Sequence, residues 1–226
     1  MPQSGSEGEP MLYNHPHPDL SRQRERGLIT RSLVIGYNAV RKRSMTLRSK
    51  LLLLALLVEG AAFVLALFLA RQWGMALFPL TEHLLRDVLI GTGAAALPFA
   101  LFCFTLSEKA DAIPLLGSVR RIMRGEIKAI FASTTLVDIC LISLWAGFAE
   151  ELLFRGVIQA KWGLVWASIL FGVLHFVTPA YALVAFVIGI YIGLVHHFFQ
   201  SLFIPIQLHA IYDFGALVYL RYAVHE

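Results

Sequence analysis

The sequence predicts an all-α fold, a polytopic membrane bundle of about six transmembrane helices, and three observations support this prediction. Hydrophobic residues make up 58% of the 226 residues and charged residues only 15%, which is more apolar side chain than one soluble core buries. Apolar runs of about 20 residues recur, the length that crosses a bilayer core about 30 Å thick. Ionisable residues inside these runs are grouped, which predicts a site buried inside the bundle.

Six segments fit a spanning helix by length and composition. The first four are residues 51–70, 88–106, about 131–154 and about 162–176, and two more lie between residues 179 and 222, on either side of a break at Gln200-Ser201. The fourth segment is short for a perpendicular crossing, so we expect it to be tilted less or shielded by its neighbours.

Residues 1–48 are predicted to form a cytoplasmic N-terminal tail, and residues 49–226 the transmembrane domain. Residues 1–21 have too few apolar side chains to order themselves, and the mixed apolar and basic stretch that follows is typical of an interfacial helix or a plain linker. The first 50 residues lack the short apolar core and cleavage site of a signal peptide, so the first span is expected to act as the anchor.

The distribution of basic residues predicts the orientation. Of the 19 Lys and Arg residues, nine precede Leu51 and five lie between Leu106 and Phe131, and such residues concentrate on the cytoplasmic side. With six spans, both termini of this multi-pass protein would lie in the cytoplasm, and we expect it in the plasma (inner) membrane.

The formal net charge of +4 does not indicate a nucleic-acid partner, because the same basic residues are explained by their place beside the spans. The expected partners are therefore the lipid bilayer and a membrane-associated peptide or protein substrate. Cys103 and Cys140 fall in different spans without metal-type spacing, so no disulfide framework is predicted.

Two adjacent glutamates stand near the end of the third expected span. Glu151 and Arg155 are four residues apart, so they share one helical face and can pair, as on many soluble helices. Glu150 points about a quarter turn away and stays uncommitted. A carboxylate in a low-dielectric cavity can accept a proton from water near neutral pH, which a general base requires.

Two further spans contribute histidines. His175 is a single imidazole in an apolar stretch, where it could bind a metal, hydrogen-bond a water or be satisfied by a backbone carbonyl. His209 and Asp213 share one helical face, so the carboxylate could orient the ring or both could bind one centre. Pro205 is expected to kink this helix and open space for water.

Two more carboxylates lie in expected spans. Glu59 and Asp138 are expected to pair with other residues or to line the cavity.

These residues, in this order, resemble the motifs of the CPBP family of intramembrane proteases, also called the Abi or type II CAAX prenyl endopeptidase family. The matching segments are Glu150-Glu151-x-x-x-Arg155, Phe171-x-x-x-His175 and His209-x-x-x-Asp213, preceded by Ser201-Leu-Phe-Ile-Pro205. The resemblance covers a core of about residues 130–222, while the first half is similar only as generic membrane helices.

The resemblance implies an intramembrane endopeptidase that hydrolyses a peptide bond in a membrane-associated substrate. Glu150 and His175 would activate water, and His209 with residue 213 would stabilise the oxyanion. Glu151, Arg155 and Phe171 would support the site structurally.

Asp213 departs from the family pattern, in which Asn is commoner. An ionised carboxylate cannot donate a hydrogen bond to an oxyanion, whereas an amide can. Asp213 is therefore expected to orient His209 or to ligate a metal. No cofactor is the favoured expectation, with a glutamate mechanism, and the alternative is zinc held by Glu150, His175, His209 and Asp213.

Two other functions compete with proteolysis. A protein of the same fold could act without proteolysis as a bacteriocin-immunity factor or membrane scaffold, but all the matched motif residues are present. A small transporter or proton relay would also need buried Glu, His and Asp residues, but the inverted repeats and paired broken helices typical of transporters are not apparent.

Overall fold

The computed structural model describes residues 22, 24–26, 28, 31 and 45–224. Residues 1–45 and 46–226 form separate units, and the second contains all the elements discussed below. The expected tail at residues 1–21 and most of the expected interfacial stretch lie outside the described residues. Within the described part of the chain the fold is all-helical, which confirms the predicted fold class.

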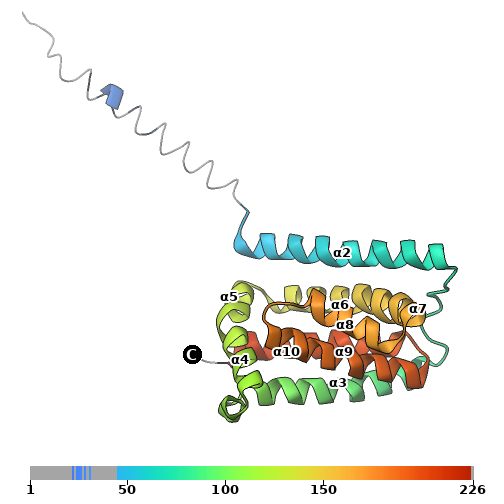
Figure 1. The fold of residues 1–226 in the computed structure, drawn as a ribbon. Helices are drawn as coiled ribbons and strands as arrows, with labels where there is room; N and C mark the ends of the chain where they lie inside the picture. Colours follow the sequence, from blue (N-terminus) through green and yellow to red (C-terminus); the bar gives the residue numbers. More distant parts are fainter. Residues whose placement is uncertain (1–21, 23, 27, 29–30, 32–44, 225–226) are drawn as a thin grey trace, which may run out of the picture. The chain divides into compact units, whose positions relative to one another are not determined.

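The elements of the second unit follow one another with short connections (Figure 1). The α-helices are α2 (Leu47–Trp73), α3 (Leu84–Leu106), α4 (Pro114–Ile122), α5 (Lys128–Phe131), α6 (Leu136–Glu151), α7 (Ala160–Trp162), α8 (Leu164–Leu174), α9 (Pro179–Phe199) and α10 (Phe203–Val218). A 3-10 helix, η1 (Glu108–Ala112), precedes α4, and π-helical turns form η2 (Met123–Ile127), η3 (Leu152–Gln159) and η4 (Tyr219–Ala223).

Four helices are long and apolar enough to cross a membrane: α2, α3, α9, and α10 with η4. Pro114–Phe131 and Leu136–Trp162 are bent by 112° and give a fifth span if they are counted as one. The described residues therefore indicate a multi-pass membrane protein with four or five candidate crossings, where the sequence predicts about six. The difference lies in α8, which has 11 residues and thus a length of only about 17 Å.

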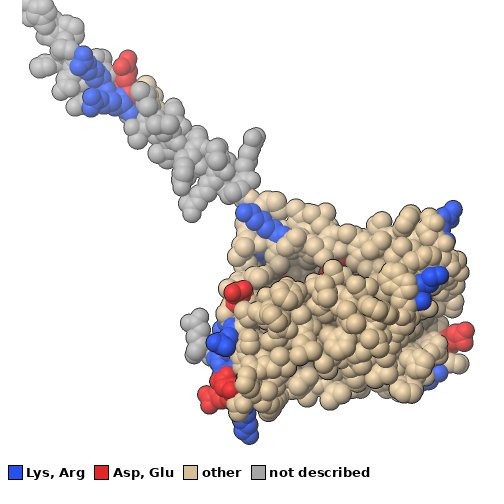
Figure 2. Space-filling view, in the orientation of Figure 1, with Lys and Arg blue, Asp and Glu red and all other residues tan. Residues whose placement is uncertain are grey.

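The surface of this unit matches a bilayer. On the visible face, charged side chains gather at two opposite ends, and the flank between them is almost uncharged (Figure 2). The flank exposes large apolar side chains such as Leu57 and Val64, which are 61% and 63% exposed. Helices α4 and α5 lie across the end at which α2 begins (Figure 1), so their basic residues lie at one end of the bundle.

Small residues bring the helices around the site into close contact. A Cβ atom on Gly147 of α6 would lie 2.8 Å from the backbone nitrogen of Ala210, so any side chain there would separate α6 from α10. A Cβ on Gly172 of α8 would lie 2.8 Å from the carbonyl oxygen of Ala182 on α9. Close backbone approach of this kind is how membrane helices pack without a hydrophobic driving force.

Two buried aspartates fasten the ends of the helices. Asp138 accepts hydrogen bonds from Arg48 at 2.6 and 2.8 Å and closes a capping box with Thr135, so it pairs and does not line the cavity. Asp87, at the start of α3, accepts hydrogen bonds from Thr81, Arg86 and Ser201. Ser201 thereby ties the start of α10 to α3.

The expected kink at Pro205 is wrong. Helix α10 begins at Phe203, so Pro205 lies in its first turn, where the backbone N–H groups have no partner within the helix. Its missing N–H therefore breaks no intrahelical hydrogen bond, and Pro205 helps to start the helix.

Candidate active site

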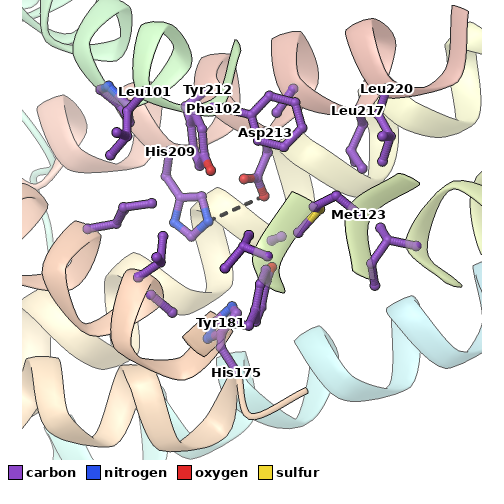
Figure 3. A pocket seen from close by; sticks show the side chains of 18 of the residues that line it. Leu101, Phe102, Met123, His175, Tyr181, His209, Tyr212, Asp213, Leu217 and Leu220 are labelled. Atoms are coloured by element: carbon purple, nitrogen blue, oxygen red, sulfur yellow. Dashed lines mark ion pairs between the residues drawn. The ribbon is translucent and has the colours of Figure 1, made fainter. Parts of the chain in front are cut away.

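A cavity of about 300 Å³ lies inside the bundle (Figure 3). Its polar lining comes from α2, α3, α6, α9 and α10 and from the residue that ends α8, and consists of Glu59, Thr105, Glu150, His175, Tyr181, His209, Tyr212 and Asp213. Apolar side chains complete the wall, among them Leu101, Phe102, Met123, Val184, Leu217 and Leu220. On the face shown in Figure 2 the flank is hollowed below α2, and acidic atoms are visible in the hollow.

A buried ionic network holds the site together. Glu151 is fully buried at the end of α6, and its Oε1 atom accepts a hydrogen bond from Arg155 Nη1 at 3.0 Å. The same oxygen lies 2.6 Å from His209 Nδ1 on α10. Arg155 Nη2 donates to the carbonyl oxygen of Gly189 on α9 at 3.0 Å. The network therefore joins three helices, which is more than the expected pairing of Glu151 with Arg155.

The aromatic ring of Phe171 closes this network from the side of α8. The guanidinium carbon of Arg155 lies 4.9 Å from its ring centroid, within the range of a cation–π contact. The same ring stacks on His175 with a centroid distance of 4.3 Å. Phe171 thus contacts both the structural arginine and the cavity histidine.

The hydrogen-bonding pattern changes from α-helical to π-helical immediately after Glu150 and Glu151. Residues Leu152–Gln159 form the π-helical segment η3, and such segments are rare and are often found at functional sites. Arg155 lies within η3, so the ion pair spans the junction of α6 and η3.

Glu150 faces the cavity. Its Oε2 atom lies 3.7 Å from His175 Nε2 and has no hydrogen-bond partner among the described residues, although this atom is buried. The distance is too long for a direct hydrogen bond and fits a bridging water. Glu150 therefore provides an unpaired carboxylate oxygen beside an imidazole.

His175 caps the end of α8, and its ring orientation is set by the backbone. Nδ1 lies 2.9 Å from the carbonyl oxygen of Phe171, which can only accept, so Nδ1 carries the hydrogen. In the neutral ring Nε2 then presents a lone pair to Glu150 and the cavity. The expected hydrogen bond of His175 to a backbone carbonyl is therefore present, and its ring also lines the cavity.

His209 lies between two carboxylates. Its Nδ1 faces Glu151, and its Nε2 lies 3.3 Å from Asp213 Oδ2 (Figure 3). Because both neighbours are acceptors, the ring suits a hydrogen on each nitrogen. Asp213 thus contacts His209, as expected of an orienting residue, and its carboxylate also faces the cavity.

The sequence left four of the polar lining residues unassigned or open, namely Glu59, Thr105, Tyr181 and Tyr212. Glu59 was expected either to pair with another residue or to line the cavity, and the structure shows that it lines the cavity. Its Oε2 atom is buried and has no partner among the described residues. Tyr181, in the first turn of α9, and Tyr212, in the middle of α10, were not predicted to line the cavity. The run of Thr178-Pro179 before Tyr181 was the one available signal of a helix start there.

The four residues expected to bind zinc do not form one ligand set. Glu150 lies beside His175, and Asp213 lies beside His209. No three His, Cys, Asp or Glu side chains in the described part of the chain are placed to hold one metal ion. The donor geometry therefore does not fit a tetrahedral zinc site, which needs three or four converging ligands.

Comparisons with known proteins match a part of this chain. Residues 132–215 match the family model described as type II CAAX prenyl endopeptidase Rce1-like. An uncharacterized protein of Bacillus subtilis (strain 168), YpbD, is 38% identical over 92 residues, which are 39% of this chain and 49% of that protein. The chain thus spans about half the length of this relative. No solved structure matches the chain.

All seven residues of the expected site lie within the matched residues 132–215. The match of residues 132–215 to the Rce1-like type II CAAX prenyl endopeptidase model confirms the resemblance drawn from the three motifs.

Proposed function

We propose that this chain is an intramembrane endopeptidase that hydrolyses a peptide bond in a membrane-associated peptide or protein. The observation that carries the proposal is the Oε2 atom of Glu150, which is buried in a cavity inside an apolar bundle and lies 3.7 Å from the Nε2 atom of His175. This atom has no hydrogen-bond partner among the described residues. Family membership of residues 132–215 supports the same activity.

The chemistry follows from the positions of these groups. A water between Glu150 and His175 would transfer a proton to Glu150 as its oxygen attacks the scissile carbonyl carbon. The resulting tetrahedral intermediate carries an oxyanion, which hydrogen-bond donors in the cavity stabilise. The C–N bond then breaks, Glu150 returns the proton to the leaving amine nitrogen, and a carboxylic acid and an amine are released.

The buried network serves this mechanism by fixing geometry. Glu151, Arg155 and the carbonyl of Gly189 lock α6, α9 and α10 together, so that Glu150 and His209 keep their positions. Catalytic groups held by such supporting contacts lose little free energy to reorganisation during the reaction.

The test is cleavage by the full-length chain in liposomes of quenched fluorescent peptides that carry a hydrophobic anchor. We expect Glu150→Gln to lower kcat about 10²- to 10⁴-fold, because the amide cannot accept the proton. Glu82→Gln is the matched control, since Glu82 is an exposed glutamate outside the cavity. A Glu150→Gln variant that cleaves at the rate of the wild type would rule out the proposal.

The proposed reaction uses no resident metal, in keeping with the separation of the two acid–histidine pairs. We therefore expect 1,10-phenanthroline and EDTA to leave cleavage unchanged, and the purified protein to contain far less than one zinc per chain by elemental analysis. Loss of activity on chelation, with recovery on adding zinc, would show instead that the cavity rearranges to bind the ion.

A further inference from the structure

The proposed hydrolysis leaves the cavity with a shortage of hydrogen-bond donors. The oxyanion needs donors about 2.7–3.1 Å away. No Lys, Arg, Asn or Gln is among the described residues that line the cavity, and Asp213 accepts when ionised. The Thr105 hydroxyl already donates to the carbonyl oxygen of Leu101 at 2.8 Å. His209 is therefore left with one ring nitrogen, Nε2, that faces both the cavity and Asp213.

Tyr181 lies where a second donor is needed. Tyr181 lines the cavity, and in Figure 3 its hydroxyl points toward the side on which His209 and Asp213 are drawn. The carboxylates of Asp213 and Glu150 are both close enough to act electrostatically on this hydroxyl. A phenol at this place can donate one hydrogen bond without introducing a charge.

The start of α9 holds Tyr181 in this position. Thr178 caps the helix, its Oγ1 atom accepting a hydrogen bond from the backbone nitrogen of Tyr181 at 3.2 Å. Pro179 occupies the first helical position, where its fixed φ favours the helix. The side chain that enters the cavity is thus attached to a backbone position fixed by the cap.

Resting on the proposed function, we infer that the Tyr181 hydroxyl donates a hydrogen bond to the oxyanion of the tetrahedral intermediate. It thereby supplies the donor that the carboxylate of Asp213 does not. Tyr181 is then a catalytic residue of this chain, and its hydroxyl compensates for the acid at position 213.

The first measurement separates kcat from KM for a quenched peptide that the wild type cleaves in liposomes. Tyr181→Phe removes only the hydroxyl, and we expect kcat to fall about 10²- to 10³-fold with KM changed less than about twofold. Tyr222→Phe is the matched control, because Tyr222 is exposed and outside the cavity. A Tyr181→Phe variant with the kcat of the wild type, or a loss seen with Tyr212→Phe instead, would overturn the inference.

The second measurement distinguishes an oxyanion donor from a packing residue. A phosphinic analogue of the cleaved peptide places an anionic tetrahedral group at the scissile position. Tyr181→Phe should weaken binding of this analogue by about the factor lost in kcat, and should leave binding of the parent peptide to a Glu150→Gln background unchanged. Equal effects on analogue and peptide, or none on either, would assign Tyr181 to packing.

The third measurement tests compensation directly. In an Asp213→Asn background the amide can donate, so Tyr181→Phe should cost less than about tenfold in kcat. An equal loss in both backgrounds would contradict the compensation. If the wild type releases no more product than Glu150→Gln, the proposed function itself fails; if cleavage depends on Glu150 but not on Tyr181, only the inference fails.

Discussion

Glu150 and Glu151 are adjacent in the chain and yet meet opposite surroundings. Glu151 is fully buried and is bound by Arg155 and His209, whereas Glu150 Oε2 has no partner among the described residues and faces the cavity. The sequence predicted this division, because residues one position apart on a helix point about 100° apart. It did not predict the contact of Glu151 with His209, which depends on how closely α6 packs on α10.

At this scale we predict that Arg155→Met destabilises the protein by about 3–5 kcal/mol. Removing one member of a buried ion pair leaves the other charge without its partner, and Arg155 also donates to the carbonyl of Gly189. The free energy of unfolding can be measured by SDS titration in mixed micelles. Glu82→Gln, at the exposed position 82, should stay within about 0.5 kcal/mol of the wild type. Equal stability of Arg155→Met and wild type would show that the network carries no net stabilisation.

The helices could be predicted less completely than the site residues. Apolar composition located α2, α3, α9 and α10, and it indicated a short fourth segment at about residues 162–176, where α8 spans only Leu164–Leu174. Gly163, at φ 86°, separates α8 from the preceding helix. His175 is the residue that ends α8, and its ring bonds back to the carbonyl oxygen of Phe171. Tyr181 escaped prediction for a related reason, since only the packed start of α9 shows where its hydroxyl points.

Helix α2 illustrates packing at the scale of an element. It contacts α6 and η3 through a stripe of small residues that includes Ala66 and Ala70, while the rest of its surface is mostly exposed. Glu59 lies toward the same side and reaches the cavity. The small residues therefore set the distance at which α2 closes one wall of the cavity.

We predict that Ala66→Leu destabilises the protein by about 1–3 kcal/mol, because Ala66 is fully buried and the larger side chain must push α2 outward. Val64→Leu is the matched control on the same helix, since Val64 is 63% exposed and should tolerate the change. SDS titration again gives the two free energies. Comparable values for the two variants would mean that α2 is not packed tightly on α6.

On the scale of the whole molecule, the basic residues support one orientation. Arg48 at the start of α2 and the basic residues of α4 and η2 lie at the same end of the bundle, which the positive-inside rule assigns to the cytoplasm. The opposite end contains the loop before α3, with Glu82. The agreement of structure and charge supports the expected orientation of α3.

We predict that cysteines introduced at Arg121 and at Glu82, in a chain with Cys103 and Cys140 replaced by Ser, react from opposite sides of the membrane. An impermeant maleimide added to intact cells should label the Glu82→Cys variant. The Arg121→Cys variant should be labelled only in inverted vesicles, because α3 lies between the two positions. Labelling of both variants from the same side would contradict a membrane-crossing α3.

The cavity is lined by two parts of the chain, one inside and one outside the residues that match the family model. Glu150, His175, His209 and Asp213 lie within residues 132–215, which match the family model. Glu59, Phe102 and Met123 come from α2, α3 and η2, which lie outside the match. Two proteins can therefore share these ionisable residues and still differ in the other side chains that line the cavity. Relatives that share the reactive residues need not share a substrate, so the substrate of a relative is a poor guide to the one that fits this cavity.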